Sequence, residues 1–179
     1  MGPSVVKVFR DKFKNQAIKT LIKSFNESLE YEPKNSIPQE IYEKAEFSTF
    51  ETYWSEDLIS GKVLNDCKVN MAEVHTGVST NKEFITIFNG MFAVIDTPKT
   101  FNKAIHIREN NRNVKFSDLK IELDFTDFEN LFDIYSSDEI TTMQILTADN
   151  MQKLVEFYKK TSIPYEFTIK DNHIYIALP

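Results

Sequence analysis

Three carboxylates and one imidazole lie close together in the first half of the sequence. Glu56 and Asp57 are adjacent, and Glu73 precedes His75 by two positions. A carboxylate beside an imidazole is the minimum for acid–base catalysis, because the carboxylate holds the imidazole tautomer and tunes its pKa. Residues two apart on a strand project from the same face, so Glu73 and His75 could act together. The candidate catalytic residues are therefore Glu73, His75 and Asp57.

The same residues have a structural interpretation. The two adjacent acids can form the turn into a strand, and Glu73 and His75 can lie on a solvated sheet face. Paired acids and a histidine can also hold a divalent cation. The other histidines, His106 and His173, lie far along the chain. Ligand-type residues this few and this dispersed predict no bound metal, and we expect no cofactor.

Other catalytic patterns are missing from the sequence. Cys67 is the single cysteine, which excludes an internal disulfide and a multi-cysteine zinc site. Ser60-Gly61-Lys62 resembles the end of a phosphate loop, but the preceding glycine and the following helix are missing. The sequence therefore favours a protein that is not an enzyme.

Trp54, the single tryptophan, follows Tyr53. Exposed aromatic side chains of this kind are typical binding anchors. A lone tryptophan where helices meet a sheet can instead close the core, and we expect this second arrangement.

The charge of the chain is unevenly distributed. The net charge is −6, yet the first 25 residues hold six cations and one acid, which leaves a strongly acidic remainder. An acidic body argues against general binding of nucleic acid.

An amphipathic helix is predicted from Ser4 to about Leu29. Large apolar residues recur at every fourth position, and Ile18 and Ile22 form an adjacent row. We expect the apolar stripe to be buried. The lysines, among them Lys12 and Lys19, have two interpretations: they face the acidic body, or they bind an anionic membrane surface. The stripe consists of Phe9, Phe13, Ala17, Leu21, Phe25 and Leu29.

The remaining elements are mostly strands. A capping box at Ser36 and Gln39 predicts a short helix to about Glu46. Strands are expected over 58–64 and 67–75, joined at Asn65-Asp66, and over 84–96 and 104–108. Asn89-Gly90 within the third strand is either a hairpin turn or part of one long bulged strand, and we favour the long strand.

The last third of the chain mixes both kinds of element. We expect a strand over 120–124, a helical turn over 126–129, an extended segment over 132–135, and a helix from Thr147 to about Lys160. Alternation over 165–178 around Asp171-Asn172 predicts a terminal β-hairpin. Helices at both ends with consecutive strands between them indicate an α+β fold with a mostly antiparallel sheet of about six to eight strands.

Several segments together resemble a known family. They are Tyr53 to Lys62, Glu73 to Thr76, Thr86 to Phe92, Phe128 to Asp138 and Asp171 to Ala177. The sequence resembles the bacterial domain-of-unknown-function family 3137 (DUF3137). That family provides no established activity. Its members often have hydrophobic segments ahead of this domain, so the resemblance implies a position next to a membrane.

We therefore expect one domain over residues 1–179, in which the helical part (1–46) packs on the sheet part (54–179). The expected function is non-catalytic binding or scaffolding in the cytoplasm, with the inner face of the membrane as a more specific location. The alternative is a small hydrolase or metal-dependent enzyme that uses Glu73 and His75. The expected partner is another protein or an anionic membrane surface, and the expected state is a monomer or weak oligomer.

Overall fold

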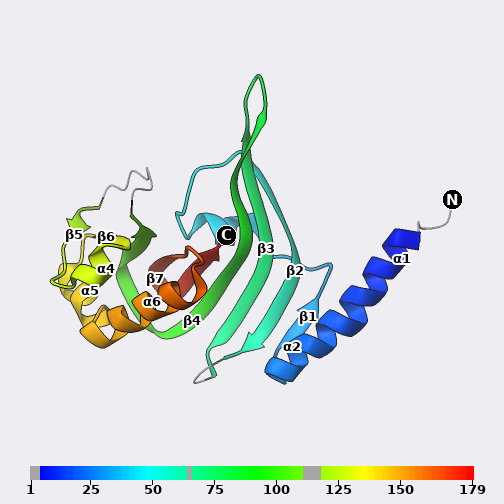
Figure 1. Cartoon of the computed structure of the whole chain (residues 1–179), viewed down its shortest axis with the longest axis horizontal. Helices are drawn as coiled ribbons and strands as arrows, with labels where there is room; N and C mark the ends of the chain where they lie inside the picture. Colours follow the sequence, from blue (N-terminus) through cyan, green and yellow to red (C-terminus); the bar gives the residue numbers. More distant parts are fainter. Residues whose placement is uncertain (1–4, 64–65, 111–117) are drawn as a thin grey trace.

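The computed structural model describes residues 5–63, 66–110 and 118–179. It contains an antiparallel sheet of seven strands in the order β1-β2-β3-β4-β6-β5, and β7 pairs with β4. Helices flank this sheet at the start of the chain and near its end (Figure 1). The predicted α+β class and strand number are confirmed.

The predicted N-terminal helix is present, with an unforeseen interruption. It runs through α1 (Val5–Lys12), the π-helical segment η1 (Phe13–Ile18) and α2 (Lys19–Phe25). The short strand β1 (Glu30–Glu32) follows, which was not predicted. The second helix, α3 (Gln39–Glu43), is shorter than predicted. Pro38 is its N-cap residue and no side chain caps it, so the predicted capping box at Ser36 is wrong.

The central strands are longer than predicted. They are β2 (Thr52–Lys62), β3 (Lys68–Ser79) and β4 (Phe84–Glu109). The expected junction at Asn65-Asp66 lies partly outside the described residues.

Strand β4 unites the two strands predicted over 84–96 and 104–108. Asn89 and Gly90 pair with His75 and Val74 inside the sheet, so the long-strand alternative is confirmed. A bulge lies beside them, because Thr76 pairs with Phe88 and Gly77 pairs with Thr86. The intervening Ile87 is the extra residue.

The C-terminal segment is one strand, β7 (Glu166–Leu178), and the predicted hairpin is wrong. The pairing of β7 with β4 changes register between Asp96 and Phe101 and again before Ile105. Asp171 has a positive φ of 54° and pairs with Phe101. The turn-forming residues therefore bend β7 along the curved β4, and the chain does not reverse.

The last third otherwise follows the prediction in part, because the strand expected over 120–124 spans only Lys120–Ile121 and a helix over Glu139–Ile145 was not predicted. It contains β5 (Lys120–Ile121), α4 (Thr126–Glu129), β6 (Phe132–Ser136), α5 (Glu139–Ile145) and α6 (Ala148–Thr161). Thr147 caps α6 by accepting a hydrogen bond from the Asn150 backbone N–H, as expected. Asp138 caps α5 in the same way, through the Thr141 N–H.

Two apolar clusters form the core. In one cluster, the helices α4, α5 and α6 pack against the C-terminal half of β4. This cluster includes Phe128, Phe132 and Tyr165. The other lies under α3, where Tyr42 contacts Phe92.

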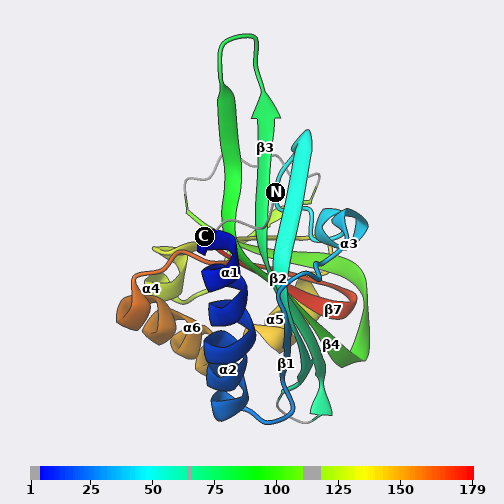
Figure 2. The ribbon, with the colours of Figure 1, turned by 90° about the vertical axis from the view of Figure 1, so that its right-hand side faces the viewer.

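The N-terminal helix corrects the predicted burial. Of the stripe, only Leu29 is buried, at 8% exposure, whereas Phe13 is 50% and Phe25 80% exposed. Phe9 and Leu21 are exposed as well. Figure 2 shows the helix lying beside β1 and β2 on the near side of the molecule. Lys14, Ile18 and Ile22 are the half-buried row, so the helix contacts the sheet through the neighbouring row and directs its stripe to solvent.

Candidate functional site

The candidate acids gather on one face of β2 and β3. Glu56 pairs with Glu73 across the two strands, and Trp54 pairs with His75 in the same way. Because alternate residues of a strand share a face, all four side chains lie on the face opposite the α3 core. The sheet register therefore brings together residues that are about 20 positions apart.

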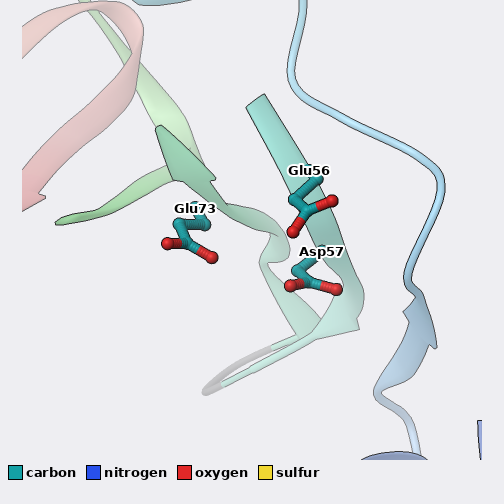
Figure 3. A group of neighbouring side chains, drawn as sticks. All are labelled: Glu56, Asp57 and Glu73. Atoms are coloured by element: carbon teal, nitrogen blue, oxygen red, sulfur yellow. The ribbon is translucent and has the colours of Figure 1, made fainter. Parts of the chain in front are cut away.

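A bulge in β2 adds Asp57 to this group. The pairing changes register between Glu56 and Ile59, and Asp57 has a φ of 60°. Carboxylate oxygens of Glu56, Asp57 and Glu73, hereafter the acidic cluster, lie within 4.8 Å of one another (Figure 3). A divalent cation uses oxygen ligands at such a spacing. The prediction that ligand-type residues are dispersed is therefore wrong for these three.

Lys14 supplies positive charge to the acidic cluster. Its Nζ donates hydrogen bonds to Glu56 Oε1 at 2.8 Å and to Asp57 Oδ2 at 2.6 Å. Burial would lower the pKa of Lys14, but the hydrogen bonds to the two carboxylates raise it above its ordinary value. Like charges directly opposite each other on a sheet repel. Lys14 thus offsets the repulsion between the paired glutamates and ties the helix to the sheet.

Tyr31 completes the contacts of Asp57. The Tyr31 hydroxyl, carried by β1, donates to Asp57 Oδ1 at 2.5 Å. Burial, followed by the hydrogen bond to this carboxylate, raises the pKa of Tyr31. The hydroxyl therefore stays protonated and remains a donor to Asp57.

His75 lies at the other end of the acidic cluster. Its Nε2 is 3.0 Å from Glu73 Oε1, and its ring centroid is 4.9 Å from that of Trp54. Trp54 is 47% exposed, so the expected core position is wrong. His75 and Trp54 line a cavity of about 200 Å³, whereas Glu56 and Lys14 line a separate one of about 170 Å³.

The remaining candidates lie elsewhere. Lys12 and Lys19 are exposed on the N-terminal helix, while His106 and His173 lie on β4 and β7, away from the acidic cluster. Sequence reasoning missed the roles of Lys14 and Tyr31. Lys14 does continue the row of Ile18 and Ile22 at four-residue spacing, which was a usable signal, but no spacing pointed to Tyr31.

The sequence profile of the family described as "Protein of unknown function (DUF3137)" matches residues 86–179, more than half of the chain. The chain belongs to the DUF3137 family. The match covers β4 to β7 and leaves the acidic cluster outside it. Among proteins with curated descriptions, none matches this chain.

One solved structure shares the fold of this DUF3137 member. It is the mycobacterial trehalose monomycolate transport factor A, TtfA, with a TM-score of 0.62 and 10% sequence identity. The alignment covers 94% of this chain and 83% of TtfA. At this identity the similarity concerns the fold alone. Of the helices described in this chain, none combines the length and apolar character that crossing a membrane requires.

Proposed function

We propose that this chain is a non-catalytic docking module whose N-terminal helix lies on an anionic membrane surface at the cytoplasmic side. The observation that carries the proposal is the exposed apolar stripe of Phe9, Phe13, Leu21 and Phe25. Exposed apolar groups in contiguous patches typically belong to interaction sites. The stripe is extended further by Val6, which is 76% exposed.

The geometry of the N-terminal helix favours contact with a flat surface. An i, i+4 repeat on an α-helix drifts by about 40° at each step, so a long stripe would wind around the helix. The π-helical segment has wider i→i+5 turns, and it lies in the middle of the stripe, at Phe13–Ile18. It offsets part of the drift between Phe9 and Phe25.

The charges favour an anionic surface. Arg10, Lys12, Lys19 and Lys23 are exposed along the same helix. Each cation near an anionic bilayer contributes about 1 kcal/mol of attraction. An amphipathic helix with aromatic residues and a basic polar face is typical of in-plane membrane binding. The fold shared with a protein named as a transport factor is compatible with a non-catalytic role.

A hydrolase or metal-dependent enzyme is the second candidate, favoured by the proximity of Glu73 to His75. Against it, Lys14 engages two of the three carboxylates, and Glu56 and His75 line two separate cavities. Hydrolysis of chromogenic esters by the wild type, abolished in both Glu73→Gln and His75→Gln, would replace the docking proposal.

Sedimentation with vesicles of phosphatidylserine and phosphatidylcholine tests the proposal. Wild-type protein should bind, and the double variant Phe13→Ser/Phe25→Ser should bind at least tenfold more weakly. Burying each phenylalanine contributes about 1.5–3 kcal/mol, and tenfold is about 1.4 kcal/mol. Because both side chains are at least half exposed, the melting temperature should change little.

The control variant is Ile140→Ser on α5, where the replaced side chain is 73% exposed but lies away from the stripe. It should bind vesicles like the wild type. Equal binding by the control and the double variant would show that the stripe does not contact the bilayer.

A further inference from the structure

Strand β4 has an open edge at its N-terminal end. β3 pairs with β4 from Phe84 to Ile95, but the pairing of β7 on the other side of β4 begins only at Met91. Within the ranges that the structure describes, no strand pairs with that second side over Phe84–Asn89. We call residues Phe84–Asn89 the open edge.

The end of β7 does not cover the open edge. A side chain at Gly90 would lie 2.1 Å from the Leu178 carbonyl oxygen and 2.6 Å from the Pro179 Cα. Leu178 and Pro179 therefore pass across the face of β4 at Gly90. Among the residues that the structure describes, no strand pairs with the backbone N–H and C=O groups of β4 on this side before Met91.

The open edge lacks the usual protection. Exposed edge strands are normally blocked by charged side chains or proline, because an unprotected edge pairs with other strands. Residues 84–90 read Phe-Ile-Thr-Ile-Phe-Asn-Gly and contain neither. A bulge at Ile87 is the single protective device. Phe84, Ile85 and Ile87 are 58%, 42% and 37% exposed.

We propose that the open edge binds the open edge of a second copy of this chain, as two antiparallel strands related by a twofold axis. Such an isologous contact needs one self-complementary surface. The open edge qualifies, because an antiparallel strand offers the complementary N–H and C=O groups to an identical partner. The proposal is independent of membrane binding.

Charge favours a second copy over a charged partner segment. Two acidic chains repel each other, but the open edge itself is uncharged. In an antiparallel pair Glu83 of one copy lies at the opposite end of the contact from Glu83 of the other. Figures 1 and 2 show the β3–β4 hairpin projecting beyond the rest of the molecule, so two hairpins can pair while the acidic bodies stay apart.

Aromatic side chains cover the sheet face inward of the open edge. Trp54 and Phe84 are exposed and line one cavity with His75. The Phe84 ring lies over Gly77, where an added Cβ would approach it to 2.2 Å. The contact therefore rests on the paired backbones and on the side chains of the open edge itself. One strand pair remains a small interface, so the dimer should be weak and concentration dependent.

Sedimentation equilibrium of the full chain, at concentrations from about 10 to 500 µM, tests the proposal, because this range brackets a weak dissociation constant. The wild type should shift from monomer towards dimer. Hydrogen–deuterium exchange of the wild type at both ends of the range should show slower exchange over residues 84–89 at the higher concentration. This measurement needs no variant.

Ile85→Lys and Ile87→Lys should each weaken association at least tenfold, because a lysine brings like charges together across the pair. Ile140→Lys on α5 places the same charge on another exposed isoleucine and should leave association unchanged. The proposal fails if the wild type stays monomeric throughout, or if both edge variants associate like the wild type. It also fails if Phe13→Ser/Phe25→Ser, and not the edge variants, abolishes association.

Discussion

His106 shows how a single residue depends on the assembled core. It is 1% exposed, its Nδ1 lies 3.0 Å from Thr168 Oγ1, and Arg108 lies beside it. Burial, followed by the positive charges of Arg108 and Lys170, lowers the pKa of His106 to about 3. Glu46 lies 3.5 Å from its Nε2 without reversing this effect. The imidazole is therefore neutral in the folded protein at physiological pH.

This environment predicts a loss of stability in mild acid. Below its ordinary pKa of about 6.5, His106 takes up a proton in the unfolded chain but not in the folded one. The free energy of unfolding therefore falls as the pH drops from about 6.5 towards 3. Relative to His106→Gln, which lacks this titration, the wild type should lose about 2 kcal/mol between pH 6.5 and pH 5.

Urea denaturation of both proteins at several pH values gives this difference. Ile140→Ser is the control, because it changes an exposed side chain without removing a titratable group, and its pH profile should follow that of the wild type. Parallel profiles for the wild type and His106→Gln would contradict the assignment of a neutral, buried imidazole.

At the scale of elements, sequence patterns predicted whether a segment is a helix or a strand better than which part of the protein that segment contacts. The four-residue repeat correctly indicated an amphipathic helix, but the row that contacts the sheet is Lys14, Ile18 and Ile22. Hydrophobic periodicity cannot show which of two neighbouring apolar rows on a helix contacts the rest of the protein. Asp171-Asn172 was predicted as a hairpin turn, and Asp171 has a positive φ, but the strand continues through it. Asp171 bends a strand because β7 follows the curved β4, and β4 is far from Asp171 in the sequence.

For the candidate site, the sequence predicted the residues that are close in the chain but not those that come from other elements. Glu73 and His75 were expected on one face of a strand because their spacing is local, and they lie 3.0 Å apart. Asp57 joins them through a bulge, and Lys14 and Tyr31 come from other elements. Such convergence depends on strand register and helix placement, which no local spacing encodes.

The contact between helix and sheet predicts the effect of removing Lys14. In Lys14→Met, the acidic cluster keeps its negative charges without their cation, and the helix loses two charge-assisted hydrogen bonds. Such bonds contribute about 1.5–3 kcal/mol each when desolvated, and less here because Lys14 is 19% exposed. Backbone amides of residues 5–25 should therefore exchange with deuterium faster than in the wild type.

The exposed Lys19→Met serves as the matched control and should keep the exchange rates of the wild type. Protection of residues 5–25 that survives in Lys14→Met would show that Ile18 and Ile22 hold the helix without the ion pairs.

At the scale of the whole molecule, the uneven distribution of charge determines which side can bind a membrane. The acidic body opposes binding to an anionic bilayer, and the basic helix favours it. The N-terminal 25 residues are basic, and the rest of the chain is acidic. A uniformly mixed charge of −6 would repel an anionic bilayer. Attraction therefore requires that the bilayer meet the helix first. Figure 2 shows the helix on the near side of the molecule, beside β1 and β2, which leaves it accessible from that side.

This arrangement predicts a strong dependence of vesicle binding on salt. Screening acts over about 30 Å at 0.01 M salt and about 8 Å at 0.15 M, so attraction by the lysines should weaken over this range. Lys12→Glu/Lys19→Glu should reduce binding to phosphatidylserine vesicles at low salt at least tenfold, since each cation contributes about 1 kcal/mol. The melting temperature should stay unchanged because both side chains are exposed.

Lys159→Glu/Lys160→Glu makes the same charge change on α6 and should bind at least fivefold more strongly than Lys12→Glu/Lys19→Glu. Binding that ignores both salt and Lys12→Glu/Lys19→Glu would mean that the apolar stripe acts alone or that another surface meets the bilayer.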